Sequence, residues 1–463
     1  MAVNETKMMQ SIYDTLFNAY TKIPPGGMAA GSQEDKMFIT MIPGGEPIDV
    51  GQYANPIGPL NPQGTPAATE NFSRLVDRLP LVKAAFVDSN VRVSEVYKAI
   101  VEGANPVPQP VNEALKAAYD KADDFLYDEA NDFNDAGQPI KIPIDSPIYA
   151  NYKRKQNAYG DAVALFMMES SKYDMTKPAD QRSWGMIGPS LQRRLTSAWN
   201  DLQGAKAKKV EDSLATLAQS SENQVGRVFE QAQNKLTVLT KASTRDQMDD
   251  YLPSYAMPAN WYSSSASEGW PRLTISSAST VINESSNYVK YGGSAGFSLG
   301  LFSVGGSASH SEERHHVDTE KDDLEVSFRY ARISIERPWM NGLIFALPDW
   351  TYGQLKAGGI SSGNPQTADG TLMTIVPTAF IVVRDLKISA TWSKSNSDLI
   401  KKATSGGGKM SFGPFSIGGS YQSNSSDFKF KSEFDGRTIS ASGLQLMSFI
   451  STVLPLSPKA SKS

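Results

Sequence analysis

Apolar side chains recur at helical spacing at the start of the chain. Residues 7 to 23 place Met8, Ile12 and Leu16 four residues apart, which predicts a short amphipathic helix. Residues 24 to 69 repeat proline and glycine and keep no period. We therefore expect an extended, loop-like arm in that segment.

Helical spacing returns at residue 70 and dominates to about residue 252, with proline or glycine between the segments. The longest pattern runs from Pro189 to about Thr244 and keeps an apolar stripe throughout. It predicts a helical bundle that contains one very long helix. Such a helix must pack along its neighbours or break once, near Gly204 or Gly226.

From Trp261 onward the pattern changes to period two, because serine, threonine, β-branched and aromatic residues alternate in short runs. This alternation predicts a mainly antiparallel β region. The fold class is therefore α+β, with an N-terminal helical bundle followed by a β domain. The predicted parts are an N-terminal helix and arm at 1–69, a helical bundle at 70–252 and a β domain at 262–463.

The β domain repeats one of its segments. The stretch "GFSLGLFSVGGS" begins at Gly296, and "KMSFGPFSIGGS" begins at Lys409; Phe302 aligns with Phe415 at an offset of 415 − 302 = 113 residues. At the same offset "LTIS" upstream falls on "LKIS". An internal duplication of 273–317 and 386–430 accounts for both matches, and a pseudo-twofold arrangement of the two units is its expected product.

Each repeated unit predicts a β-hairpin. Gly300 and Gly413 stand first in a two-residue turn, as a type II′ turn requires. Pairing outward from the turns places Leu299 opposite Phe302 and Met410 opposite Ile417, so that each hairpin has one apolar face and one face of serine and glycine. The apolar faces comprise Phe297, Leu299, Phe302, Val304, Met410, Phe412, Phe415 and Ile417.

Two functions follow from these amphipathic hairpins. In one, they insert into a membrane, as in pore-forming, toxin-like proteins whose strands carry an apolar lipid face. In the other, the apolar faces pack on the protein's own core or on a neighbouring subunit, and the chain is an intracellular structural or scaffold protein. Both hypotheses predict a self-assembling homo-oligomer, and membrane lipid is a partner only in the first.

The three histidines of the chain, His310, His315 and His316, stand together in a segment rich in charge. They allow a pH switch, since histidine titrates near pH 6.5, or a metal site. A solvated strand end of mixed charge is the simpler interpretation. We predict no metal and no cofactor.

Two tryptophans, Trp339 and Trp350, stand in a proline-stiffened connection between the repeats. An aromatic pair of this kind faces carbohydrate or lipid in some proteins. More often such side chains close the end of a β core, and we expect that here.

The composition narrows the class of protein further. A net charge of −4 without a dense run of lysine and arginine argues against nucleic acid as a partner. The absence of cysteine excludes disulfides, thiolate metal sites and a cysteine nucleophile. The N-terminus lacks the pattern of a signal peptide, which predicts a protein made in the cytoplasm and, if it acts outside, released or exported without a cleaved signal.

Catalytic motifs are missing from the sequence as well: there is no G-x-S-x-G, H-E-x-x-H or P-loop pattern. We therefore predict a non-enzymatic protein, and a hydrolase on the β domain is the last of the alternatives.

Overall fold

The structure is a computed structural model of the 463-residue chain. It describes residues 5–21, 36–58, 61, 64–106, 113–133, 139–170, 172–173, 177–218, 222–245, 248–265, 267, 270–279, 286–293, 302–304, 313–315, 317, 319–406, 409–422 and 427–459.

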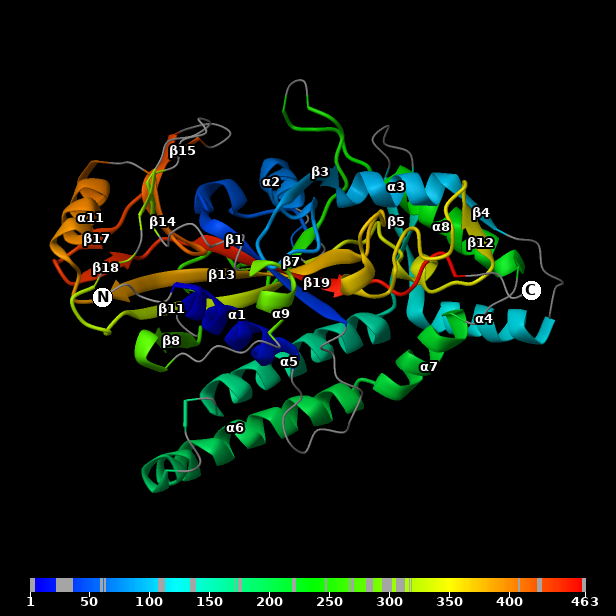
Figure 1. Ribbon diagram of the computed structural model, residues 1–463. Coiled ribbons are helices and arrows are strands. Elements are labelled where there is room, and N and C mark those ends of the chain that lie inside the picture. The colour runs from blue at the N-terminus through cyan, green and yellow to red at the C-terminus, as the bar shows by residue number, and fades with distance from the viewer. Residues whose placement is uncertain are drawn as a thin grey trace.

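A large antiparallel sheet runs through the middle of the molecule (Figure 1). Its main path, in spatial order, is β1 (Met37–Pro47), β19 (Gln445–Val453), β13 (Ile375–Ser389), β11 (Glu325–Glu336) and β7 (Tyr255–Met257). Three further strands extend it: β8 (Arg272–Ser276) pairs with β11, β18 (Thr438–Ala441) with β13, and β17 (Glu433–Phe434) with β18. Alternating and β-branched sequences such as "EVSFRYARISIE" explain why these segments are strands.

A second sheet of five strands stands at one end of the first, near helix α11 (Lys394–Gly406) in Figure 1. Its order is β10 (Glu313–His315), β9 (Phe302–Val304), β14 (Met410–Phe412), β15 (Phe415–Gln422) and β16 (Asp427–Phe430). The sheet therefore combines strands from both repeated segments.

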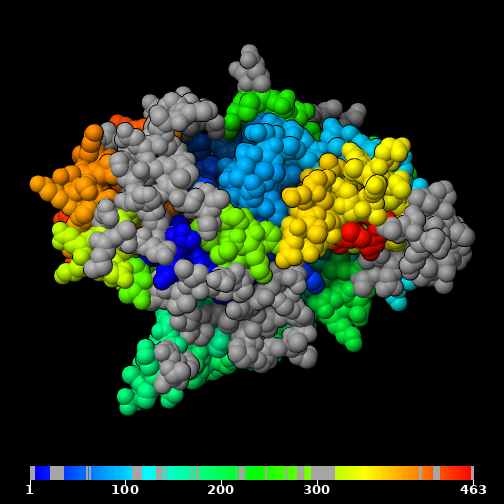
Figure 2. Space-filling view, in the orientation of Figure 1, coloured from blue at the N-terminus to red at the C-terminus, as the bar shows by residue number. Residues whose placement is uncertain are grey.

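Helices cover the large sheet and extend beyond it. The longer ones are α1 (Glu5–Thr21), α2 (Pro66–Val76), α3 (Val93–Gly103), α4 (Glu113–Leu126), α5 (Pro147–Ser170), α6 (Pro178–Gly204), α7 (Ala207–Ala218) and α8 (Glu222–Leu239). Short helices are α9 (Asn287–Lys290) and the 3₁₀ turns η2 (Val50–Tyr53), η4 (Ser277–Ser279), η5 (Gly342–Phe345) and η6 (Pro365–Thr367). Small two-stranded sheets pair β2 (Arg78–Pro80) with β3 (Asp88–Arg92), β4 (Ala104–Pro106) with β12 (Trp350–Tyr352), and β5 (Tyr127–Phe133) with β6 (Pro139–Asp145). The space-filling view shows α6, in blue-green, projecting from the body (Figure 2).

The prediction of mixed helical and antiparallel β structure is confirmed, but the prediction of one very long helix is wrong. Three helices, α6, α7 and α8, share that part of the chain. The first break falls just after Gly204, where Lys206 adopts a left-handed φ of 60° that an α-helix cannot continue. Pro189 does not begin the helix either, since α6 starts at Pro178 and carries Pro189 inside it.

The interpretation of residues 24–69 as loop-like is also wrong for much of that segment. Residues Met37–Pro47 form β1, which pairs with β19, and α2 begins at Pro66. In β1 the residues from Phe38 to Ile42 are buried on both faces. A strand with two buried faces reads as a continuous apolar run without alternation, so the period-two signal was absent.

The strands upstream of the two hairpin segments occupy corresponding places beside β11. Val326 of β11 pairs with Ile275 of β8 on one side and with Ile388 of β13 on the other, and 388 − 275 is again 113. Both flanking strands run antiparallel to β11 and paired residues share a face. The two strands are therefore related by a shift across the sheet. The pseudo-twofold expectation is wrong for them, because a twofold axis would reverse either the strand direction or the face.

Separate apolar cores lie against the large sheet. One joins α1, α5, the five-stranded sheet and one face of β11 and β13. Another holds α2 and Trp261 against Phe380 and Phe449. A further core unites helices α3, α4, α7 and α8 with residues 339–376, and Trp339 and Trp350 are fully buried in it. Both tryptophans thus close a core, and neither is exposed to a ligand.

Helix α2 is tied to the connection that leads from the helices into β7. The buried carboxylate of Glu70 accepts hydrogen bonds from Ser243 Oγ at 2.7 Å, from Thr244 N and Oγ1 at 2.7 and 2.6 Å, and from Arg74 Nε at 2.8 Å. Burial alone would raise the pKa of Glu70, but these hydrogen bonds outweigh it and lower the pKa to about 2. The ionised carboxylate therefore stabilises this junction.

The first prediction concerns this carboxylate. Because its folded-state pKa lies below the unfolded value of about 4.3, Glu70 contributes its full stability above that value and loses it as the pH falls towards 2. We expect Glu70→Gln to lower the free energy of unfolding at pH 7. The difference in this free energy between the variant and wild type should shrink by about 1–2 kcal/mol by pH 3. Urea titrations at each pH measure it, with the exposed Glu230→Gln as control. A difference that stays constant with pH would contradict the role of the ionised form.

Candidate functional site

Strands β14 and β15 form a hairpin with the two-residue turn Gly413-Pro414. Gly413 has a φ of 55°, the positive value that the first central position of such a turn requires. Phe412 pairs with Phe415 and Ser411 with Ser416, but a bulge then shifts the register, so that Met410 pairs with Gly418. The expected pairing of Met410 with Ile417 is therefore wrong by one residue, because Ile417 is the extra residue of the bulge.

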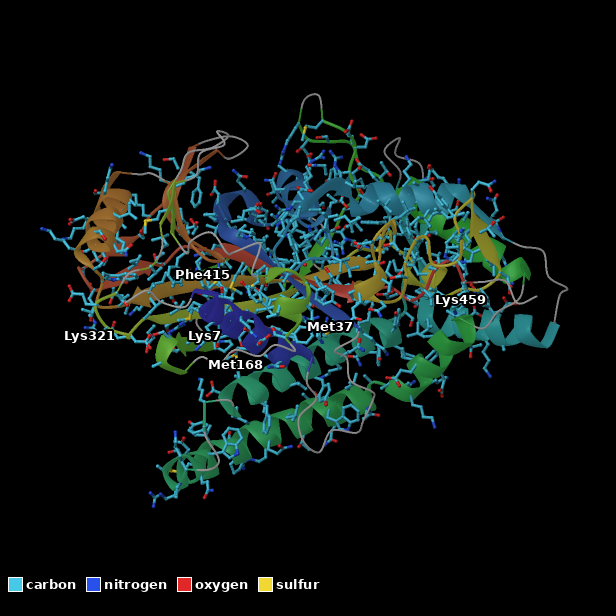
Figure 3. The ribbon with its side chains drawn as sticks, in the orientation of Figure 1. Lys7, Met37, Met168, Lys321, Phe415 and Lys459 are labelled. Atoms are coloured by element: carbon cyan, nitrogen blue, oxygen red, sulfur yellow. The ribbon has the colours of Figure 1, made fainter. Side chains whose placement is uncertain are left out.

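The apolar face of this hairpin is packed on the protein's own sheet. Met410, Phe412, Phe415 and Ile417 are all buried, none more than 2% exposed. The ring of Phe415 lies 5.0 Å, centroid to centroid, from that of Phe328 on β11; Figure 3 labels Phe415 beside the long strands. In this state the face meets neither solvent nor lipid.

A glutamine side chain holds the first half of β15 to the large sheet. Gln445, at the start of β19, accepts a hydrogen bond from Ser416 N through Oε1 at 2.6 Å and donates one from Nε2 to Ser416 O at 3.3 Å. The side-chain amide thus imitates the pairing of a neighbouring strand. Both residues are fully buried, so the glutamine supplies hydrogen bonds to two backbone groups that water does not reach.

Two glycines of β1 bring its backbone against the same hairpin. Gly44 N donates to Gly413 O at 2.6 Å. A Cβ on Gly45 would lie 2.7 Å from Gln445 Oε1 and 2.8 Å from Pro414 O, closer than real contacts allow. Both glycines have positive φ, 75° and 59°. We call Gly44, Gly45 and Gln445 the hairpin clamp.

The first repeated segment is placed only in part. Strand β9 pairs on one side with β14, with Phe302 opposite Phe412, and on the other with β10, where Phe302 is opposite His315. Val304 likewise pairs with Met410 and Glu313. The repetition of the hairpin stays a prediction, because Phe297, Leu299 and Gly300 lie outside the described residues, as do His310 and His316.

Sequence reasoning missed the clamp, although one signal was present. Gly44 and Gly45 belong to the proline- and glycine-rich pattern that predicts a loop, and Gln445 is the one amide side chain of the strand Gln445–Val453. A lone glutamine in a buried strand needs hydrogen-bond partners. That need was detectable, but the partner, 29 residues away in sequence, was not.

A charged cluster joins the helices to the other end of β11. Lys153 Nζ of α5 lies 2.8 Å from Asp145 Oδ2 and 3.4 Å from Glu336 Oε2. Burial alone would lower the pKa of Lys153, but the two carboxylates raise it well above its ordinary value. Nearby, burial lowers the pKa of Lys235, whose Nζ lies 5.3 Å from the ring centroid of Tyr127. The cluster fixes α5 to the sheet by paired charges.

Within the described part of the chain, no group of three or more histidine, aspartate or glutamate side chains is placed to hold a metal ion. None of the helices described there combines the length and apolar character needed to cross a bilayer. No protein family model, curated protein or solved structure matches the chain. The hairpin and its clamp are therefore the candidate site on structural grounds alone.

The clamp can be tested by a matched pair of glycine substitutions. Gly45→Ala and Gly353→Ala both place alanine at positive φ, 59° and 49°, which costs roughly 1–2 kcal/mol in each case. Only Gly45→Ala adds a methyl group against the hairpin, since nothing lies within 4 Å of a Cβ at Gly353. We expect Gly45→Ala to destabilise the protein by about 1–3 kcal/mol more than Gly353→Ala, measured by chemical denaturation. Equal losses would show that the close approach is unimportant.

Proposed function

We propose that this chain is a non-enzymatic, self-assembling protein, and that the docked hairpin β14–β15 is the segment through which copies associate. The observation that carries the proposal is how the hairpin is held. Among the described residues, no backbone ladder joins the five-stranded sheet to the large sheet. Side-chain packing and the clamp hold it, so the five-stranded sheet can leave with its hairpin, still paired to β9 and β16, without breaking the pairing of β1, β19, β13 and β11.

The energetics favour release only onto another apolar surface. Exposing Met410, Phe412, Phe415 and Ile417 to water costs roughly 1.5–3 kcal/mol each, hence about 6–12 kcal/mol together. That is comparable to the whole net stability of an ordinary domain, about 5–15 kcal/mol. A hairpin that leaves its dock must therefore be covered again, by a second copy or by lipid.

A second copy is the better supported of these two surfaces. A strand that crosses a bilayer needs about 9–11 residues, whereas β14 has three and β15 has eight. Insertion as a pore-forming, toxin-like element would require the strands to lengthen at the expense of their neighbours. A contact between copies requires only that the apolar face leave its own dock and pack on a second copy instead. In the alternative function, an intracellular structural or scaffold protein, the hairpins are likewise the contacts between subunits, and no membrane takes part.

A disulfide between the clamp and the hairpin tests whether the hairpin must leave its dock for copies to associate. A Cβ on Gly44 would lie 3.3 Å from Cβ of Ser411, close to the ~3.5–4.5 Å of natural disulfides, and the chain contains no other cysteine. We expect oxidised Gly44→Cys/Ser411→Cys to remain monomeric in light scattering and to leave dye-loaded liposomes intact. Reduction should restore wild-type behaviour, and the single Gly44→Cys variant controls for backbone strain.

The outcomes are distinct. An oxidised protein that assembles as wild type does would show that the hairpin stays docked, and would contradict both the proposed function and the scaffold alternative, in which the hairpins are also the contacts. A wild-type protein that neither oligomerises nor perturbs liposomes between pH 5 and pH 8 would contradict both functions and reopen the hydrolase alternative.

Weakening the clamp should have the opposite effect. Gln445→Leu removes both hydrogen bonds that its side chain makes with Ser416, at a cost of about 0.5–1.5 kcal/mol each. We expect lower stability together with faster assembly, followed by light scattering over time. The exposed Gln192→Leu is the control. Lower stability with unchanged or slower assembly would count against release of the hairpin as the limiting step.

A further inference from the structure

Helix α6 packs on α5 through one stripe only. Trp184, Leu191 and Leu195 lie on that stripe and meet Phe166 and neighbouring residues of α5. Gly188 belongs to it as well: a Cβ there would lie 2.7 Å from the ring of Trp184, so glycine allows the indole to fold against the helix. The opposite side of α6 is exposed, on the arm that projects from the body (Figure 2).

The outward face combines apolar and cationic side chains. Met186 is 78% exposed, the largest exposure of any large apolar side chain in the described residues, and Ile187 beside it is 41% exposed. Arg182, Arg193 and Arg194 are exposed too, although Arg194 also interacts electrostatically with Asp161 of α5. Arg182, Met186 and Arg193 are spaced four and seven residues apart, which places them on one side of the helix.

The acidic residues of α6 lie outside this stretch. From Arg182 to Arg194 the sequence contains three arginines and no aspartate or glutamate. Asp201, further along the helix, is held by Lys155 of α5 at 2.5 Å, and Asp180 precedes the stretch in the first turn. A locally cationic strip about 16 Å long, at 1.5 Å per residue from Arg182 to Arg193, thus stands on a chain of net charge −4.

We infer that this face of α6 binds the surface of an anionic lipid bilayer. The arginines bind lipid phosphates and carboxylates, while Met186 and Ile187 enter the boundary between headgroups and acyl chains. A protein partner fits less well, because two exposed apolar residues fall far short of the roughly 1,000 Å² that a stable interface buries.

This binding is independent of the proposed function. It uses no residue of the hairpin or its clamp, and a protein whose hairpin never moves would still bind. The oxidised Gly44→Cys/Ser411→Cys protein should therefore bind vesicles as wild type does. Failure of hairpin release would then not contradict lipid binding by α6, and failure of lipid binding would not contradict hairpin release.

Co-sedimentation with vesicles tests the inference. The full chain should bind vesicles of phosphatidylserine and phosphatidylcholine, and bind pure phosphatidylcholine at least tenfold more weakly. Each basic residue near a charged membrane contributes about a fivefold change in partitioning. We therefore expect Arg182→Gln/Arg193→Gln/Arg194→Gln to lose about 100-fold, and Met186→Ser/Ile187→Ser to weaken binding to both vesicle types.

The control removes the same charge elsewhere. Lys98, Lys356 and Lys401 are exposed on other elements, and their triple change to glutamine should leave binding within a few-fold of wild type. All altered side chains are exposed, so circular dichroism and thermal unfolding should match wild type in each variant. The inference is overturned if wild type does not bind anionic vesicles, if the lysine control loses as much as the arginine variant, or if the arginine variant instead abolishes association between copies in the absence of lipid.

Discussion

Burial of strand β13 on both faces is the constraint around which the fold is arranged. Ile381 and Val383 face the core that contains α1 and the hairpin, while Phe380 and Val382 face the core that contains α2 and Trp261. A strand in the middle of a sheet can be apolar on both sides only if each side is covered. The hairpin is one of these covers, so its release would cost the protein part of its own core.

The sequence predicted the kinds of element well and their arrangement less well. Period-two runs in the second half are strands, and the hairpin turn lies at Gly413, as the glycine predicts. Strand β1 was missed, since a strand buried on both faces shows no alternation. The long helix was overestimated because an apolar stripe continues across a break that a single left-handed residue, Lys206, produces.

At the candidate site, too, the sequence predicts the local elements but not how they are arranged. The apolar face of the second hairpin could be listed from its sequence, but what covers it could not, since pairing of residues distant in sequence is a property of the folded chain. Gln445 and Gly45 act on the hairpin through close approach and hydrogen bonds, and neither leaves a periodic signal. The cationic strip of α6 needed the structure for another reason: only the packing on α5 shows which of its residues face outward.

The pairing of β1 with β19 has a consequence for biosynthesis. Ile39 pairs with Ile450, and 450 − 39 = 411 residues separate them. On the ribosome β1 emerges early, yet both β1 and β13 lack the strand that lies between them until β19 has been made. Contacts of such long range slow folding, and unpaired edges recruit other chains. The central sheet of the nascent protein therefore stays open while the residues between β1 and β19 are made, and its unpaired edges need protection during that time.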